Sequence, residues 1–150
     1  PLPQGLKREI MDPIGASNTW HWEPYDNAYV TIDGKKMPSI PGGGHHGGGM
    51  FISAWDMARF GYLFLNNGKW GTRQLVTEKW IQMARTPTKP RPTYGFMNWY
   101  FNANRPGRVS FQGNGPNTIH IDWNHDLVIV TRWLGGGPAF VDAVIAAKKN

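Results

Sequence analysis

The sequence predicts an α+β fold in which helices pack on an antiparallel β-sheet. Residues 54–65 and 78–85 both show helical apolar spacing bounded by capping residues. Short apolar runs between residues 109 and 133 are separated by Gly- and Asn-containing turns, as is typical of antiparallel strands. The 150 residues include 19 Gly, 12 Pro, 8 Trp and 7 Phe, so we expect one packed domain with many turns.

The N-terminal part has weak secondary-structure signals. Residues 5–11 are expected to form a short helix that ends before Asp12-Pro13, because the residue before a proline avoids the helical region. Residues 14–28 predict a loop with a short extended piece near Trp20. A hairpin should follow, with Asp33-Gly34 as its turn between residues 29–32 and 35–40.

A glycine-rich stretch, residues 42–49, surrounds His45 and His46. Glycine is retained where backbone must adopt unusual angles or be approached closely, so this stretch suits the rim of a site. Adjacent histidines on an extended chain point to opposite sides, and no third ligand is evident nearby, so we predict neither a metal nor another cofactor. A plain loop wall and a substrate contact through His45 or His46 remain open.

The helix predicted over residues 54–65 has clear boundaries. Ser53 is a good N-cap, and Asp56 three residues later resembles a capping box. Met57, Phe60 and Phe64 form one apolar stripe. The following sequence, residues 66–68 (Asn-Asn-Gly), predicts a left-handed stop.

The second half of the chain is predicted to supply two more helices and the main sheet. Thr77 should cap the helix over residues 78–85, and the aromatic run 94–101 favours a strand. Three further strands are expected, and the last is nearly continuously apolar, which predicts a central position in the sheet. These strands span residues 109–113, 117–123 and 127–133. A final helix should begin at Pro138.

Charge and composition narrow the possible partners. The net charge is +6, but the basic residues are scattered along the sequence, so we expect a solvated surface and no nucleic-acid partner. There is no cysteine and no apolar run long enough for a membrane helix. The chain starts at Pro1 without an initiator Met, and we interpret this start as a cut: a processed product, an expressed fragment or part of a longer chain.

The sequence lacks the common motifs of nucleophilic serines and of zinc proteases. It contains no G-x-S-x-G, no S-x-x-K and no H-E-x-x-H. Gly113-Asn114-Gly115 follows a predicted strand and is either a tight turn or a place where a backbone N–H can approach an oxyanion. From the residues alone, the chain offers the rim of a site without a nucleophile.

Several segments resemble the β-lactamase-related serine hydrolases, the group of class C β-lactamases, esterases and DD-carboxypeptidases. Residues 48–63 (GGMFISAWDMARFGYL) are similar to the family segment GG-[LM]-x-S-x-x-D-[ML]-A-R-F-x-x-[LM]. Residues 11–16 resemble its I-x-x-P-L-G-M segment, residues 94–99 its YG-x-G-W strand, and residues 111–130 the paired strands that close its sheet. The resemblance covers almost the whole chain in the family's order.

The resemblance implies a β-lactamase/transpeptidase-like fold of which residues 1–150 are the C-terminal part. In the family, the acylating serine and lysine of S-x-x-K and the tyrosine of Y-x-N precede the segments matched here, in a domain about twice this length. The complete protein is then expected to be a serine hydrolase, with this part inactive alone. Its partners are the missing N-terminal part and a small ester, amide or peptide-like substrate. A bacterial periplasmic or exported location fits the resemblance, although the sequence itself gives no compartment.

The resemblance also implies site residues. The family's third motif, K-[ST]-G or H-x-G, falls on Phe111-Gln112-Gly113, where the glycine matches and the cation is absent. That cation helps to bind a substrate carboxylate in the family, so its absence favours an ester or amide other than a penicillin. The residue after the glycine, here Asn114, implies a backbone N–H in the oxyanion hole. His45 and His46 are expected at the mouth of the cleft.

Two alternatives remain open. The abundant aromatic residues, including Trp20 and Trp22, could form the platform of a non-catalytic carbohydrate- or ligand-binding module. The chain could also be an inactive remnant, or a product that pairs with a separately encoded N-terminal half.

Overall fold

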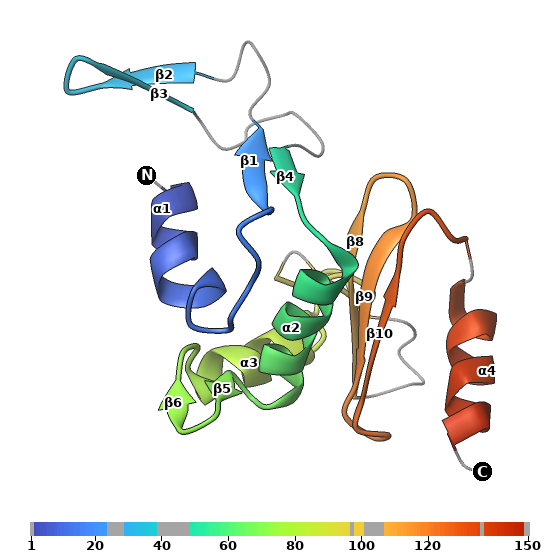
Figure 1. The fold of residues 1–150 in the computed structure, drawn as a ribbon. Coiled ribbons are helices and arrows are strands. Elements are labelled where there is room, and N and C mark those ends of the chain that lie inside the picture. The colour runs from blue at the N-terminus through green and yellow to red at the C-terminus, as the bar shows by residue number, and fades with distance from the viewer. Residues whose placement is uncertain are drawn as a thin grey trace.

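The fold is α+β, with helices packed on small antiparallel sheets, as the sequence predicts (Figure 1). A computed structural model describes residues 2–23, 29–38, 49–96, 98–100, 107–135 and 137–148. In Figure 1, α2 lies in the middle of the molecule, with the N-terminal helix to one side and the main sheet to the other.

The N-terminal helical segment consists of α1 (Leu2–Leu6) and a π-helical turn, η1 (Lys7–Met11). It ends at Met11, immediately before Asp12-Pro13, as predicted, but it begins earlier than expected. The chain then turns back, and Met11 and Ile14, each 1% exposed, pack against Leu63 of α2. This contact fixes the N-terminal segment against the central helix.

Two short antiparallel pairs follow. β1 (His21–Glu23) pairs with β4 (Gly49–Phe51), so Trp22 lies opposite Met50. The sequence predicts an extended piece near β1 but no strand at β4. The reason is that β4 begins at Gly49, the last residue of the glycine-rich stretch, which carries no strand signal. β2 (Tyr29–Ile32) and β3 (Lys35–Pro38) form the predicted hairpin.

The turn of that hairpin has the geometry that Asp-Gly favours. Asp33 and Gly34 have φ values of 51° and 73°, so both central residues are left-handed. Such turns match the twist of a two-stranded ribbon.

α2 (Ala54–Leu65) begins and ends where its capping residues predict. The Ser53 hydroxyl accepts a hydrogen bond from the Asp56 N–H at 3.1 Å. At the other end Asn67 is left-handed, with φ of 53°, and the Gly68 N–H donates to the Leu63 carbonyl at 2.8 Å.

A small hairpin, β5 (Lys69–Trp70) and β6 (Arg73–Gln74), leads to α3 (Glu78–Arg85). Thr77 caps α3 as expected, and its hydroxyl accepts from the Trp80 N–H at 3.3 Å. Of the apolar residues spaced along α3, Ile81 and Ala84 are buried, whereas Trp80 is 38% exposed and reaches the core only at the edge of the Phe64 ring.

The main sheet has four antiparallel strands in the order β10-β9-β8-β7. Their bounds are β7 (Trp99–Tyr100), β8 (Arg108–Gly113), β9 (Asn117–Asp122) and β10 (Leu127–Thr131). The prediction that the last of these strands is central is wrong, because β10 is an edge strand. Its continuous apolar sequence instead reflects cover on both faces, by α2 on one side and α4 (Gly137–Lys148) on the other.

The strand expected over residues 94–101 is shorter than predicted. Tyr94 forms a single bridge with Trp99, and only β7 joins the sheet. Residues 97 and 101 lie outside the described part of the chain.

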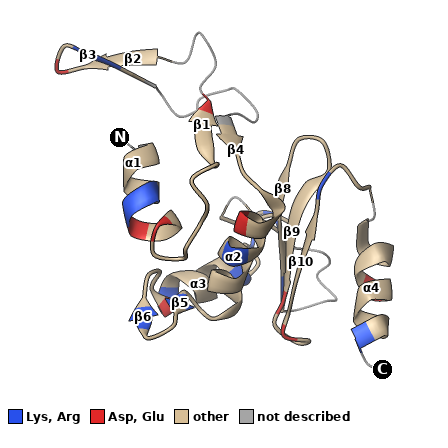
Figure 2. Cartoon of the chain, in the orientation of Figure 1, with Lys and Arg blue, Asp and Glu red and all other residues tan. Residues whose placement is uncertain are grey.

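Charged residues are distributed over several elements (Figure 2). Blue Lys and Arg positions occur on η1, α2, the β5–β6 hairpin and α4, interspersed with acidic positions. Among the described residues, no helix has the length and apolarity needed to cross a membrane.

Candidate functional site

Two of the predicted site residues, Gly113 and Asn114, lie at one end of the main sheet, in and beside the turn between β8 and β9. Gly113 is the last residue of β8 and is paired with Asn117, the first residue of β9. Asn114 follows directly, and the Asn117 side-chain amide donates to the Asn114 carbonyl at 2.6 Å. This hydrogen bond fixes the peptide plane that follows Asn114.

The turn is further shaped by a tryptophan ring. A Cβ atom on Gly115 would lie 1.9 Å from the Trp133 ring, and Gly115 has φ of +71°. Only glycine is compatible with both the close approach and the backbone angle. The Trp133 indole is itself 72% exposed, so it covers the turn from the solvent side.

Arg132 connects this turn to the start of α2. Its Nε donates to the Asn117 Oδ1 at 3.1 Å, and its guanidinium also donates to the Ile52 carbonyl. Ile52 immediately precedes the N-cap of α2. A cation is therefore placed beside the β8–β9 turn, although the matched motif lacks one in β8. The sequence analysis missed Arg132; its only signal was a charged residue at the end of an apolar strand.

Phe111 and Gln112 lie on opposite faces of β8, because strand side chains alternate. The half-buried Phe111 ring meets the rings of Phe60 and Phe64 at centroid distances of 5.9 and 5.0 Å. Gln112 is exposed, and its amide donates to the Ser110 hydroxyl at 3.0 Å. Phe111 thus anchors the strand to α2, and a substrate contact through Phe111 or Gln112 stays a prediction.

His45 and His46, the other predicted contacts, lie outside the described residues. The structure describes the chain again from Gly49, the first residue of β4. Their contact with a substrate at the mouth of the cleft therefore stays a prediction.

A buried carboxylate holds the start of α2 in place. Asp56 is 0% exposed and accepts from the Ser17 N–H at 3.0 Å, the Ser17 hydroxyl at 2.6 Å and the Ser53 hydroxyl at 2.9 Å. Arg59 donates to the same carboxylate at 3.1 Å. Burial by itself would raise the pKa of Asp56, but these hydrogen bonds and the Arg59 charge bring that pKa below its usual value. The expected capping residue is thus also a tertiary anchor for the segment around Ser17.

A second cluster of polar side chains lies on the face of the sheet that packs against α4. Asp122, 3% exposed, receives Arg108 Nε at 2.7 Å and lies 2.8 Å from His125 Nδ1. Arg108 also contacts Asp142 of α4 at 3.3 Å. These contacts attach α4 to the sheet.

His120 lies on the same face as Asp122 and is 7% exposed. Burial lowers its pKa to about 4, so the ring is neutral at neutral pH. Among the described residues, no group of three or more His, Cys, Asp or Glu side chains is placed to hold a metal ion.

Comparison with known proteins supports the fold. No protein-family model matches the chain, and no curated protein shows significant sequence similarity to it. Among solved structures, it is similar to a crystal structure from Bacteroides dorei DSM 17855, of a protein provisionally assigned as a beta-lactamase. The TM-score is 0.65 at 17% identity, over 97% of this chain and 51% of that one. The chain therefore has a β-lactamase-like fold and spans about half the length of that structure.

Proposed function

We propose that this chain forms one wall of the active-site cleft of a β-lactamase-related serine hydrolase. The complete enzyme acts on an ester or amide through an acyl-enzyme, and these residues contribute the strand end that binds the oxyanion. The attacking serine is assigned to a segment outside residues 1–150, because the sequence contains no S-x-x-K.

The observation that carries this proposal is the construction of the β8–β9 turn. Asn114 lies in a turn that is held by the Asn117 amide, by the Trp133 ring over Gly115 and by Arg132. Oxyanion stabilisation depends on N–H donors that are fixed before the reaction begins, since reorienting them would cost free energy. The pairing of Gly113 with Asn117 and the hydrogen bond to the Asn114 carbonyl hold the chain on both sides of the Asn114 N–H, which supports its assignment as such a donor.

The proposed step is acyl transfer. The serine oxygen attacks the substrate carbonyl carbon, and the carbonyl oxygen becomes an oxyanion. The Asn114 N–H and the serine's own N–H donate to this oxyanion, and collapse of the intermediate expels the alcohol or amine and leaves the acyl-enzyme. A general base in the other part of the enzyme takes the serine hydroxyl proton during the attack and, now as a general acid, returns it to the leaving alcohol or amine. Water then hydrolyses the acyl-enzyme and frees the serine.

Labelling with a fluorophosphonate tests the proposal. We expect the complete gene product to gain one covalent adduct, located by peptide mass spectrometry in the segment preceding Pro1. The 150-residue chain alone should gain none. A complete gene product that does not label would refute the serine hydrolase assignment and favour the alternative of a non-catalytic binding module.

A further inference from the structure

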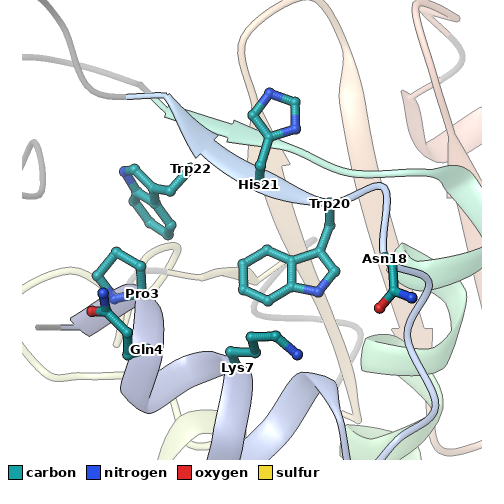
Figure 3. Close-up of a pocket in the computed structure, with 7 residues that line it drawn as sticks. All are labelled: Pro3, Gln4, Lys7, Asn18, Trp20, His21 and Trp22. Carbon is teal, nitrogen blue, oxygen red and sulfur yellow. The ribbon is translucent and has the colours of Figure 1, made fainter.

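We propose that a hollow between α1 and β1 binds a neutral pyranose sugar. The hollow measures about 360 Å³, within the usual size range of small-ligand sites (Figure 3). It is formed by residues on the opposite side of α2 from the main sheet, so this inference does not rest on the hydrolase proposal.

The strand geometry places two indole rings on one side of the hollow. Trp20, His21 and Trp22 alternate, so the two tryptophans share a face while His21 turns away from it. His21 instead stacks on Phe51 of β4, with centroids 4.9 Å apart and ring planes at 4°. Figure 3 shows the Trp20 and Trp22 rings directed toward the helix that carries Pro3. The ligand space is therefore bounded by two aromatic rings and a helix.

The Trp22 indole nitrogen is a hydrogen-bond donor without an acceptor. Its Nε1 atom is buried and, among the described residues, has no partner. The atom has almost no solvent-accessible surface, so it does not face the open hollow. Trp22 therefore contributes its ring, not its N–H, to the lining.

The polar groups around the hollow match hydroxyls better than charges. Gln4 and Asn18 are exposed lining residues, and carboxamides both donate and accept hydrogen bonds, as sugar hydroxyls do. The ammonium group of Lys7 already pairs with Asp12. No unpaired charge of the described lining therefore faces the ligand space, which favours a neutral ligand over an anion.

A pyranose ring combines the two properties that this lining requires. Its C–H groups carry partial positive charge and pack against the negative face of an indole ring. Its hydroxyls reach outward to donors and acceptors at the rim. Two indole rings beside two carboxamides thus fit a neutral sugar.

NMR of the complete protein, labelled with ¹⁵N at the tryptophan indoles, tests this assignment. The probes are methyl β-D-glucopyranoside, N-acetylglucosamine and cellobiose, with D-glucuronate as the charged counterpart. We expect saturable shifts of the Trp20 and Trp22 indole signals with at least one neutral probe, at millimolar concentrations, and weaker binding of glucuronate. The Trp55 signal should not move, since Trp55 lies on α2 and is not one of the residues that line the hollow.

Variants distinguish direct contact from a structural effect. Trp22→Phe replaces the indole with a smaller ring and so reduces the surface on which a sugar can pack, and we expect about threefold to tenfold weaker binding. Asn18→Ala, at an exposed position that should not affect folding, is expected to weaken binding about threefold to tenfold. Trp55→Ala is the matched control and should bind unchanged.

Three results would overturn the proposal: no saturable shift with any neutral probe, preferential binding of glucuronate, or unaltered binding by both Trp22→Phe and Asn18→Ala. None of them bears on fluorophosphonate labelling. Failure of sugar binding and failure of the hydrolase proposal are therefore separable.

Discussion

The two faces of the main sheet are built from different chemistry. The face toward α2 is apolar: Val109, Ile119 and Ile121 are buried against Met57 and Phe64. The face toward α4 also excludes water, but it contains several buried polar side chains. These are Ser110, Thr118, His120, Asp122 and Thr131.

The two faces therefore stabilise the fold in ways that differ in their dependence on pH. Apolar burial toward α2 contributes free energy that depends little on pH. Burial of ionisable groups toward α4 makes folding depend on their protonation and on intact partners. Variants on the two faces should therefore differ in how much they lower the free energy of unfolding, and also in how that loss depends on pH.

The largest effect is expected on the apolar face, from Phe64→Ala. Phe64 is 4% exposed, and its ring contacts Phe111 at 5.0 Å and Trp80 at 5.8 Å. The variant should lower the free energy of unfolding by about 3–5 kcal/mol, measured by urea denaturation. Trp55→Ala, on the exposed side of the same helix, should change it by no more than about 0.5 kcal/mol. Similar losses in both variants would contradict this arrangement.

His120 should make the polar face sensitive to acid. Its pKa falls from 6.5 to about 4 on folding, because burial disfavours the charged ring. The unfolded chain thus binds the proton more readily, and stability should decrease as the pH falls from about 6.5 to about 4, by at most about 3 kcal/mol.

Chemical denaturation across that pH range compares wild type with His120→Gln. The variant should show a shallower loss of stability between these two pH values. Parallel curves for the two proteins would show that His120 does not cause the dependence.

Asp122→Asn should weaken the attachment of α4 to the sheet. It removes the negative charge that receives Arg108 and lies beside His125. Because Arg108 keeps its contact with Asp142, we expect a loss of about 2–3 kcal/mol, measured by thermal and urea denaturation. The control, Asp126→Asn, changes an exposed residue with φ of 50°, a backbone angle that asparagine tolerates, and should have little effect. An equal loss in both would refute the role of the Asp122 contacts.

The smallest effect concerns the close approach of α2 to the sheet. A Cβ on Gly61 would lie 2.6 Å from Val128 Cγ1 and 2.8 Å from Ile119 Cγ2. Gly61→Ala should therefore destabilise the protein by about 1–2 kcal/mol, despite the better helix propensity of alanine. Gly5→Ala, where no atom lies within 4 Å of the added carbon, should be neutral or slightly stabilising in the same denaturation assay. A stabilising Gly61→Ala would mean that the helix does not pack this closely.

Local signals in the sequence predicted most element boundaries. Ser53 and Thr77 cap their helices as expected, and Asp33-Gly34 forms the hairpin turn. In each case the hydrogen bond or backbone angle involves residues close in sequence, so the pattern contains the needed information.

Features that depend on distant residues were not predictable in the same way. The apolar sequence of β10 reports cover on both faces but not its place at the sheet edge. Asp56 resembles an ordinary capping residue, and only the fold brings Ser17 to it. At the candidate site, the sequence indicated Gly113 and Asn114, whereas Arg132 and Trp133 become their neighbours only through strand pairing.

The most direct test of the proposed cleft is the turnover of the complete enzyme with an activated ester such as p-nitrophenyl acetate. Asn114→Pro removes the backbone N–H, while Asn114→Ala keeps it and removes only the side chain. We predict that the proline variant loses about 10²–10³ in kcat with its fold intact by circular dichroism, while the alanine variant stays close to wild type. Equal turnover of the proline variant and the wild type would contradict the assignment of Asn114 to the oxyanion hole.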